Sequence, residues 1–350
     1  MTILAKVCGE GCQSDCIRVP TMQFLFSDTV NKWENQVTEI LRGIIAAMET
    51  EAPPKPKRAV RGEWLMLLTA VIWGTGFVAQ RQGMAFVGPF TFIAARFLLG
   101  GLALIPVLFF TKTLPLKPLQ DSPKLNWLPA VFFCGAALFT AASLQQIGLK
   151  TTSAGKGGFI TALYIVIVPI LGLLLKKKVR RIIWLAVVIA TLGLYLLTIK
   201  SGIAISKGDL TVLAGAFVWA VHILLIDHYS ESVPGLLIAC GQFLVTGVLG
   251  LIATLLFENI ELSALLAGSG TILYAGLIVV SLAYTLQVLG QKGVNPSVAA
   301  LILSLESVFA VLSGALVLNE RLTPREWLGC ALMLAAVIMT QLGSSENKTE

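Results

Sequence analysis

The sequence predicts an all-α polytopic membrane protein whose ten transmembrane helices form two inverted five-helix repeats. Three observations support this fold class: a very apolar composition, ten long apolar runs, and a residue pattern that occurs twice. Of 350 residues, 56% are hydrophobic and 13% are charged, and the mean hydropathy is +0.84. Soluble domains carry about a quarter charged residues. A soluble globule therefore has too few charged residues to cover this much apolar surface.

Ten apolar runs have the roughly 17 to 25 residues that a helix needs to cross a bilayer. Short segments with proline, glycine or charged residues separate them. A transmembrane β-barrel would instead show alternating segments of about ten residues. We therefore expect ten membrane-spanning helices, at residues 64–83, 88–110, 127–148, 155–175, 182–200, 210–228, 234–257, 270–290, 297–318 and 326–342.

The lysines and arginines of the loops predict the orientation of these helices, because cytoplasmic loops are enriched in both residues. They are concentrated before the first helix, between the second and third, and at 176–181 between the fourth and fifth. The net charge of +7 thus reports topology and gives no reason to expect a nucleic-acid partner. We expect the N- and C-termini in the cytoplasm.

A repeated pattern, A-x-x-L-Q-x-x-G-x-K, places Gln145 in the third helix and Gln287 in the eighth, 142 residues apart. The first helices of the two halves match at a nearby offset of 146, which pairs Trp73 with Trp219. Similar composition explains single Leu or Gly matches, but not a collinear Gln, Gly and Lys. Because five spans separate equivalent helices, the two copies must enter the membrane from opposite sides. Many secondary transporters are built in this way, with a substrate site near the midplane.

The repeats divide the chain into four parts. We expect an N-terminal cytoplasmic extension at 1–62, a first repeat at 63–202, a second repeat at 203–343 and a cytoplasmic tail at 344–350.

The N-terminal extension has a composition of its own and no equivalent in the repeats. Apolar residues at helical spacing predict an amphipathic helix at 28–48. Cys8, Cys12 and Cys16 form C-x3-C-x3-C without the histidine or fourth cysteine of a closed zinc site, so we expect no metal. Met48 opens a short basic leader that suits the first helix. Our hypothesis is that translation starts there.

Several short motifs resemble those of the EamA family of the drug/metabolite transporter (DMT) superfamily: W-G-T-G-F at 73–77, L-E-S-V-F-A at 305–310 and N-E-R-L-T at 319–323. The resemblance covers residues 64–342. The chain departs from the family pattern at Ser307, where proline is frequent, and at Lys178, the counterpart of Glu320. The resemblance implies an efflux transporter, expected in a bacterial inner membrane, for a small-molecule substrate that the family does not specify.

Glu306 lies in the middle of the ninth helix, where an ionisable side chain costs about 2.5–3.5 kcal/mol. Two interpretations are open: a relay for a proton or cation, and a hydrogen-bonded acid that holds helices together. Its equivalent in the first half is Tyr164. The two-fold relation is therefore broken at this point, as ion coupling on one side would require.

Other polar residues inside the helices are candidates for the substrate site. Gln145 and Gln287 could meet substrate in turn, or stabilise helix contacts by about 0.6 kcal/mol each. Arg96 could bind an anionic substrate, although snorkelling to the interface is the interpretation we favour. Its equivalent in the second half is Gln242.

Four aromatic or imidazole side chains complete the candidate set. His222 lies opposite Gly76 in the repeat and is either a site residue or a partner in an interhelical hydrogen bond. Trp73 and Trp219 lie within their helices, where they could stack on a substrate, although core packing is the simpler explanation for each alone. Tyr284 is the weakest candidate.

The absence of several motifs narrows the function. The sequence has no G-x4-G-K-[ST], so neither ATP-driven transport nor an ATP-binding subunit is implied. It has no H-E-x-x-H or G-x-S-x-G and only two histidines, so we expect neither an enzyme nor a cofactor. We expect a secondary active exporter of a small metabolite, amino acid or drug-like solute, working by alternating access on a proton or substrate gradient, as a monomer or homodimer. An uptake permease or facilitative exchanger is the alternative, with a channel or membrane enzyme behind it.

Overall fold

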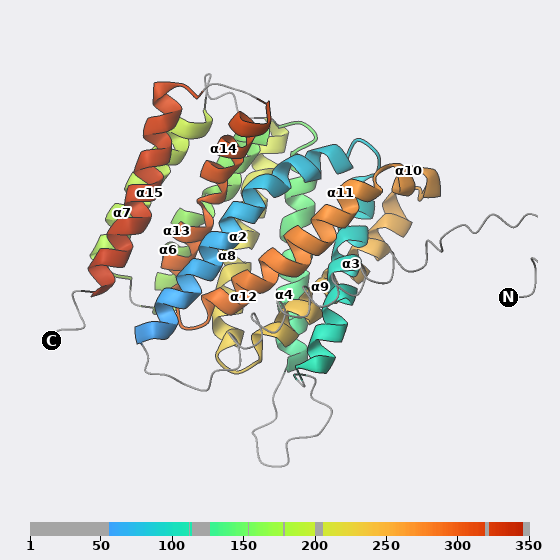
Figure 1. Ribbon diagram of the computed structural model, residues 1–350, viewed down its shortest axis with the longest axis horizontal. Helices are drawn as coiled ribbons and strands as arrows, with labels where there is room; N and C mark the ends of the chain where they lie inside the picture. Colours follow the sequence, from blue (N-terminus) through green and yellow to red (C-terminus); the bar gives the residue numbers. More distant parts are fainter. Residues whose placement is uncertain are drawn as a thin grey trace, which may run out of the picture. The chain divides into compact units, whose positions relative to one another are not determined.

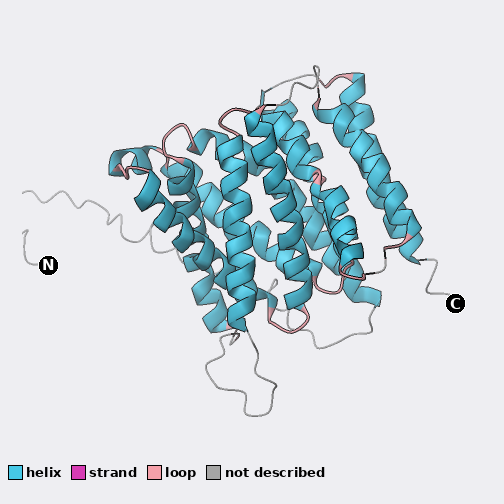
Figure 2. Cartoon of the chain, turned by 180° about the vertical axis from the view of Figure 1, so that it is seen from behind, coloured by secondary structure: helices cyan, strands magenta, loops and turns pink. Residues whose placement is uncertain are grey.

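The structure, a computed structural model, describes residues 56–111, 113, 127–152, 154–177, 179–199, 206–318 and 322–345. This part of the chain consists of helices and connecting loops, without a β-strand (Figure 2). Eight of its helices are long and apolar enough to cross a membrane. The chain is therefore a polytopic membrane protein, as predicted. The expectations for the cysteine cluster, the helix at 28–48, Met48, Lys178 and Glu320 concern positions outside the described residues.

The first half of the described chain contains the six helices α2 to α7, and Figure 1 shows how the helices are arranged. Helix α3 begins at a Gly-Pro pair, and Pro89 suits this place because the first helical residue needs no N–H donor. The bounds of the helices are α2 Pro56–Gly83, α3 Pro89–Phe110, α4 Trp127–Gly148, α5 Ala154–Ala162, α6 Tyr164–Leu174 and α7 Arg181–Thr198.

The second half contains α8, α9, the short helix α10, a composite helix made of α11, η1 and α12, a helix broken into α13 and α14, and the last helix, α15. Helix α8 begins with a capping box in which Ser206 and Asp209 satisfy each other's backbone N–H groups. The bounds are α8 Lys207–Ser230, α9 Gly235–Phe257, α10 Leu262–Ala267, α11 Ser269–Tyr274, the π-helix η1 Ala275–Tyr284, α12 Thr285–Gln291, α13 Pro296–Leu303, α14 Glu306–Leu318 and α15 Pro324–Ser345.

Two of the expected spans are interrupted at equivalent positions. The run at 155–175 is divided at Leu163 into α5 and α6, and the run at 297–318 is divided at Ser304 and Leu305 into α13 and α14. The Ser304 hydroxyl donates to the Leu301 carbonyl at 2.8 Å, and such side-chain bonds compete with the helical ladder. The eighth expected span is continuous but contains η1, and wide helical turns of this kind occur frequently at functional sites.

Corresponding helices of the two halves pack against each other. Helix α3 lies along α9, and α7 lies along α15 (Figure 1). Other contacts between the halves also occur in pairs that the repeat relates. Helix α4 packs against α8, and their equivalents η1 with α12 pack against α2. Helix α6 packs against α8, and its equivalent α14 packs against α2.

Glycines allow the closest of these approaches. A Cβ atom on Gly193 of α7 would lie 2.8 Å from the Gly329 carbonyl oxygen of α15, and one on Gly329 would lie 2.6 Å from the Gly193 oxygen. Gly62 of α2 and Gly290 of α12 meet in the same way, at 2.4 and 2.7 Å. Small residues at such crossings let backbones pack closely in membranes, where van der Waals contact is a main source of helix association.

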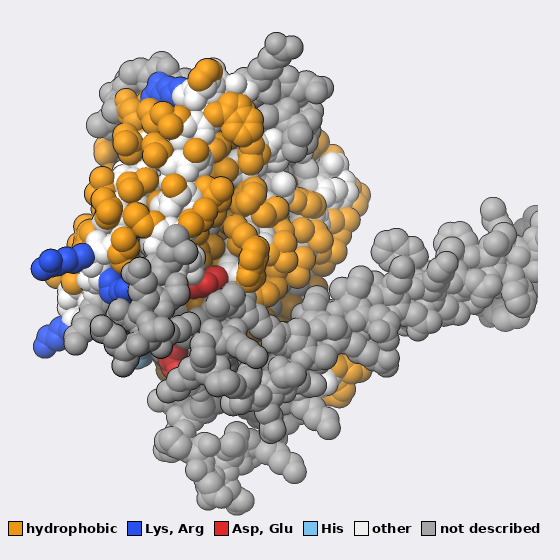
Figure 3. Space-filling model, turned by 60° about the vertical axis from the view of Figure 1, so that its left-hand side comes forward, with side chains coloured by type: hydrophobic (Ala, Val, Ile, Leu, Met, Phe, Trp, Pro, Cys, Tyr) orange, Lys and Arg blue, Asp and Glu red, His pale blue; other side chains and the backbone are white. Residues whose placement is uncertain are grey.

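The outer surface of the bundle is apolar. Large hydrophobic side chains such as Phe110, Leu174 and Phe257 are exposed, whereas many polar side chains of the same helices are buried. Hydrophobic atoms cover most of the described surface on the face in Figure 3. A surface this apolar suits contact with lipid, and it leaves the polar groups to build an internal site.

Candidate functional site

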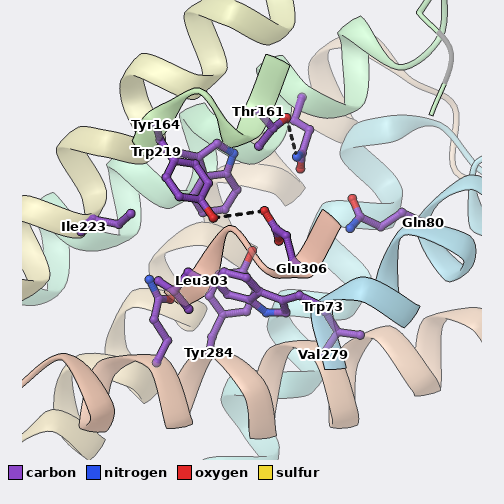
Figure 4. Close-up of a pocket in the computed structure, with 12 residues that line it drawn as sticks. Trp73, Gln80, Thr161, Tyr164, Trp219, Ile223, Val279, Tyr284, Leu303 and Glu306 are labelled. Atoms are coloured by element: carbon purple, nitrogen blue, oxygen red, sulfur yellow. Dashed lines mark hydrogen bonds between the residues drawn. The ribbon is translucent and has the colours of Figure 1, made fainter. Parts of the chain in front are cut away.

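A cavity lined by residues from both halves lies inside the bundle (Figure 4). It has about 470 Å³ of space not filled by atoms, part of it open to solvent. Helices α2, α4, α5 and α6 contribute from the first half, and α8, η1, α12, α13 and α14 from the second. The lining residues are Trp73, Gln80, Gln145, Thr161, Tyr164, Trp219, Ile223, Val279, Tyr284, Gln287, Leu303 and Glu306.

The two helix breaks bring the central polar pair of the cavity together. Tyr164 is the first residue of α6 and Glu306 is the first residue of α14, so each directly follows a break. The Tyr164 hydroxyl donates to Glu306 Oε1 at 3.2 Å, across a sequence separation of 142 residues (Figure 4). This separation equals the offset of the A-x-x-L-Q repeat. The two residues that the repeat makes equivalent thus touch each other.

Three aromatic rings form a continuous group beside this pair. The ring centroid of Tyr284 is 4.6 Å from that of Trp73 and 6.2 Å from that of Trp219, and the planes of Tyr284 and Trp219 differ by only 22°. Tyr284 therefore contacts both tryptophans. In Figure 4, Trp219 lies on one side of Glu306, and Trp73 and Tyr284 lie on the other.

The glutamines of the cavity differ in how their amides are satisfied. Gln145 Nε2 donates to the Thr161 hydroxyl at 3.1 Å. Its repeat equivalent Gln287 is buried, and its Oε1 has no hydrogen-bond partner; the same is true of Gln80 Oε1. The indole N–H groups of Trp73 and Trp219 also lack an acceptor. The cavity thus presents donors and acceptors that the described protein atoms leave unpaired.

Three predicted site residues lie elsewhere in the bundle. Arg96 is 2% exposed, and its guanidinium lies over the rings of Phe92 and Phe97, 5.2 and 5.0 Å from their centroids. His222 Nε2 and Gln242 Oε1 share a hydrogen bond of 2.9 Å between α8 and α9. None of the three lines the cavity. The other seven candidates do line it, and their part in substrate binding stays a prediction.

Five lining residues were not among the predicted site residues: Gln80, Thr161, Ile223, Val279 and Leu303. Two of them had a signal in the sequence. Gln80 follows Trp73 by seven residues, or two helical turns, and so shares its helix face. Thr161 precedes Tyr164 by three residues. The three aliphatic residues had none, because nothing distinguishes them from lipid-facing side chains.

The described part of the chain contains no group of three or more His, Cys, Asp or Glu side chains that could hold a metal ion.

The comparisons with known proteins agree with this architecture. The sequence model of the EamA-like transporter family matches the chain twice, at residues 60–199 and 206–342. An uncharacterized transporter of Archaeoglobus fulgidus is 33% identical over 283 residues, covering 79% of this chain and 84% of the relative. The uncharacterized transporter YwfM of Bacillus subtilis is 30% identical over 295 residues, covering 81% and 95%.

Two further comparisons are more distant. The uncharacterized inner membrane transporter YedA of Escherichia coli is 25% identical over 282 residues, covering 78% of this chain and 88% of the relative. One protein crystal structure has the same fold, with a TM-score of 0.68 at 18% identity, covering 81% of this chain and 98% of that one.

An apolar helical bundle with an internal cavity that both halves line, with polar as well as aromatic side chains, is an architecture typical of membrane transporters. The chain belongs to the EamA-like transporter family, within the DMT superfamily.

Proposed function

We propose that the protein is a secondary active exporter of a small metabolite, amino acid or drug-like solute, working by alternating access between its two halves. The cavity carries this proposal, because both halves line it and its central acid lies where two broken helices meet. In secondary transporters, discontinuous helices near the midplane form the substrate and ion sites. A rocking motion of one half against the other would change the side from which such a cavity is reached.

The proposal includes ten spans. Helices α2 and α15 then cross the membrane in addition to the eight long apolar helices of the described chain. At about 1.5 Å per residue, the 28 residues of α2 reach about 42 Å and the 22 residues of α15 about 33 Å. Both exceed a hydrocarbon core of about 30 Å. Each also packs along membrane-spanning partners, α2 with η1 and α12 and α15 with α7.

Inverted topology follows from five spans in each half. Contacts between the halves support this topology, because each contact joins ends of two helices that the expected topology places on the same side of the membrane. Glu258, after the seventh span, contacts the start of the second span at Thr91. Thr152, after the third span, donates to Asp209 at the start of the sixth, at 2.9 Å.

The opposite side shows a contact of the same kind. Lys177, in the loop after the fourth span, forms an ion pair with Asp227 near the end of the sixth. The basic loop at 176–181 gives this side its cytoplasmic assignment, with both termini on it. The relative YedA is described as an inner membrane transporter, and we propose the same location for this chain.

Glu306 is the proposed coupling residue for protons. It is the only acidic side chain among the described lining residues and is 5% exposed. Binding or release of a proton there would change the charge of the cavity and would weaken or strengthen the hydrogen bond from Tyr164, because a charged acceptor binds more strongly than a neutral one. That contact joins α6 to α14, one helix from each half. Protonation and helix movement would thereby be linked.

A two-stage experiment tests this function. Cells expressing the protein are screened for tolerance of, and reduced accumulation of, a panel of amino acids, amines and toxic analogues. The compound found is then followed in proteoliposomes under a pH gradient. A gradient of one pH unit corresponds to about 1.36 kcal/mol per proton. If one proton is coupled to each substrate molecule, this gradient supports about a tenfold ratio of substrate concentration across the membrane.

Glu306→Gln should reduce this ratio to 1, since an amide keeps the shape and a hydrogen-bond acceptor for Tyr164 but does not ionise near neutral pH. Glu261→Gln, in an exposed loop position, is the matched control. A full gradient response in Glu306→Gln would reject Glu306 as the coupling residue. Flux that rises linearly with concentration without saturation would reject a carrier in favour of a channel.

A further inference from the structure

The charge of the cavity sets limits on its ligand. Among the twelve described lining residues, Glu306 is acidic and none is a lysine, arginine or histidine. The buried cation Arg96 lies over the phenyl rings of Phe92 and Phe97 and does not line the cavity. A carboxylate or phosphate on the ligand would therefore enter without a cationic partner, and a buried unpaired anion is strongly disfavoured.

The walls of the cavity suit a positive charge. Four lining residues carry aromatic rings, of which Tyr284 contacts both Trp73 and Trp219, while Tyr164 bonds to Glu306. The faces of tryptophan and tyrosine attract cations, most strongly where water is excluded, and aromatic cages bind ammonium groups in this way. An acid beside such a group of rings adds a direct counter-charge.

The unpaired polar atoms specify the ligand further. Gln80 Oε1 and Gln287 Oε1 are buried acceptors without a donor, so the ligand should carry N–H or O–H groups. The indole N–H groups of Trp73 and Trp219 are donors without an acceptor, and a π-face or an uncharged oxygen of the ligand can satisfy them. A quaternary ammonium ion offers no N–H, so it would leave both glutamine oxygens unpaired.

From these observations we propose that the cavity binds a small protonated amine with an apolar or aromatic body. The ammonium group lies between Glu306 and the aromatic rings and donates to Gln80 or Gln287. This inference rests on the proposed transport function, for which it names the substrate class. It excludes anions, and it also disfavours zwitterions that keep a carboxylate next to the amine.

Probes that share one skeleton and differ in charge test the proposal. We would measure binding to the purified full-length protein in detergent, by calorimetry and by the rise in melting temperature with ligand concentration. The probes are 2-phenylethylamine (cation), phenylalanine (zwitterion), phenylacetate (anion) and 2-phenylethanol (neutral). We expect the amine to bind at least tenfold more tightly than each of the others. Equal or tighter binding of the zwitterion or the anion would overturn the proposal, and so would binding of none.

A methylated probe and two variants locate the binding. N-trimethylated 2-phenylethylamine should bind more weakly than the amine, and equal binding would overturn the role given to Gln80 and Gln287. Trp219→Leu should weaken amine binding about 30-fold, the equivalent of about 2 kcal/mol for a desolvated cation–π contact. Trp219→Phe, which keeps a ring, should weaken it less and guards against misfolding of the leucine variant. Trp327→Leu, at a surface site that is 57% exposed, is the control.

The outcomes separate this inference from the transport function. If the cellular screen finds a saturable, gradient-driven anionic substrate, the transport function stands and the amine proposal fails. If the amine binds with the expected response to Trp219→Leu but neither it nor any panel compound is transported, the binding site stands and the transport function fails.

Discussion

Glu258 should contribute strongly to stability, although it lies in a loop far in sequence from the helix that it contacts. Its carboxylate covers the first turn of α3. Oε1 accepts from the Phe90 N–H at 3.0 Å, and Oε2 accepts from the Thr91 N–H at 2.9 Å and from the Thr91 hydroxyl at 2.7 Å. Gly88 at the N-cap has no side chain that could do the same. The carboxylate thus satisfies two helix N–H groups and interacts favourably with the helix dipole.

Glu258→Ala removes these three hydrogen bonds and the charge. Loss of a capping acceptor costs about 0.5–2 kcal/mol, and loss of the charge at the helix N-terminus costs about 0.3–1 kcal/mol. Water can replace part of the bonding, so we expect destabilisation of about 2 kcal/mol. Glu261 lies exposed in the same loop. The control Glu261→Ala, which also removes one negative charge, should change stability by less than about 0.5 kcal/mol.

Gly88→Ala tests the same contact from the other side. A Cβ atom on Gly88 would lie 2.2 Å from the Glu258 carboxyl carbon, so the carboxylate would have to move. Since both substitutions break one contact, the double variant should lose much less than the sum of the single losses. Unfolding of each purified variant in one detergent, followed by tryptophan fluorescence, measures these differences. The explanation is refuted if Glu258→Ala is as stable as Glu261→Ala, or if the two losses add.

Two further predictions concern helix packing. Gly329→Ala would place a Cβ atom 2.6 Å from the Gly193 carbonyl oxygen, and by separating α7 from α15 it should cost about 1–3 kcal/mol. Gly270→Ala, with no atom within 4 Å of the added Cβ, should be neutral, and comparing the two melting temperatures checks this. His222→Leu should cost about 1–3 kcal/mol, because it leaves the Gln242 amide buried without its partner. Substrate affinity should be unchanged, and a lower affinity at unchanged stability would instead place His222 in the site.

The sequence predicted the membrane class and the position of most helices correctly, because the apolar character of each run is a local property. A backbone in lipid must satisfy its own hydrogen bonds, so a long apolar run has few alternatives to a helix. The repeat offset also identified Tyr164 and Glu306 as equivalent residues. It did not indicate that they would touch, since contact depends on how the two halves pack.

Which side of most of these helices faces the cavity was not predictable from the sequence. These helices are apolar on nearly all sides, so no polar stripe marks the face that turns inward. Only their polarity indicates Arg96, His222 and Gln242 as site residues, and the structure places them in packing between helices. Gln80 and Thr161 are no more polar than these three, but the packing of their helices turns them to the cavity.

The sequence by itself thus determined a chain of apolar helices in two related halves, because hydropathy and repetition are properties of short segments and their order. Only the tertiary structure decided where α5/α6 and α13/α14 break, which rings surround Glu306, and that Glu258 caps α3. Each of these features requires residues from different helices to meet, or a helix to give up hydrogen bonds inside the bundle. The packing of all helices together sets the free energy of such arrangements, and no single segment contains it.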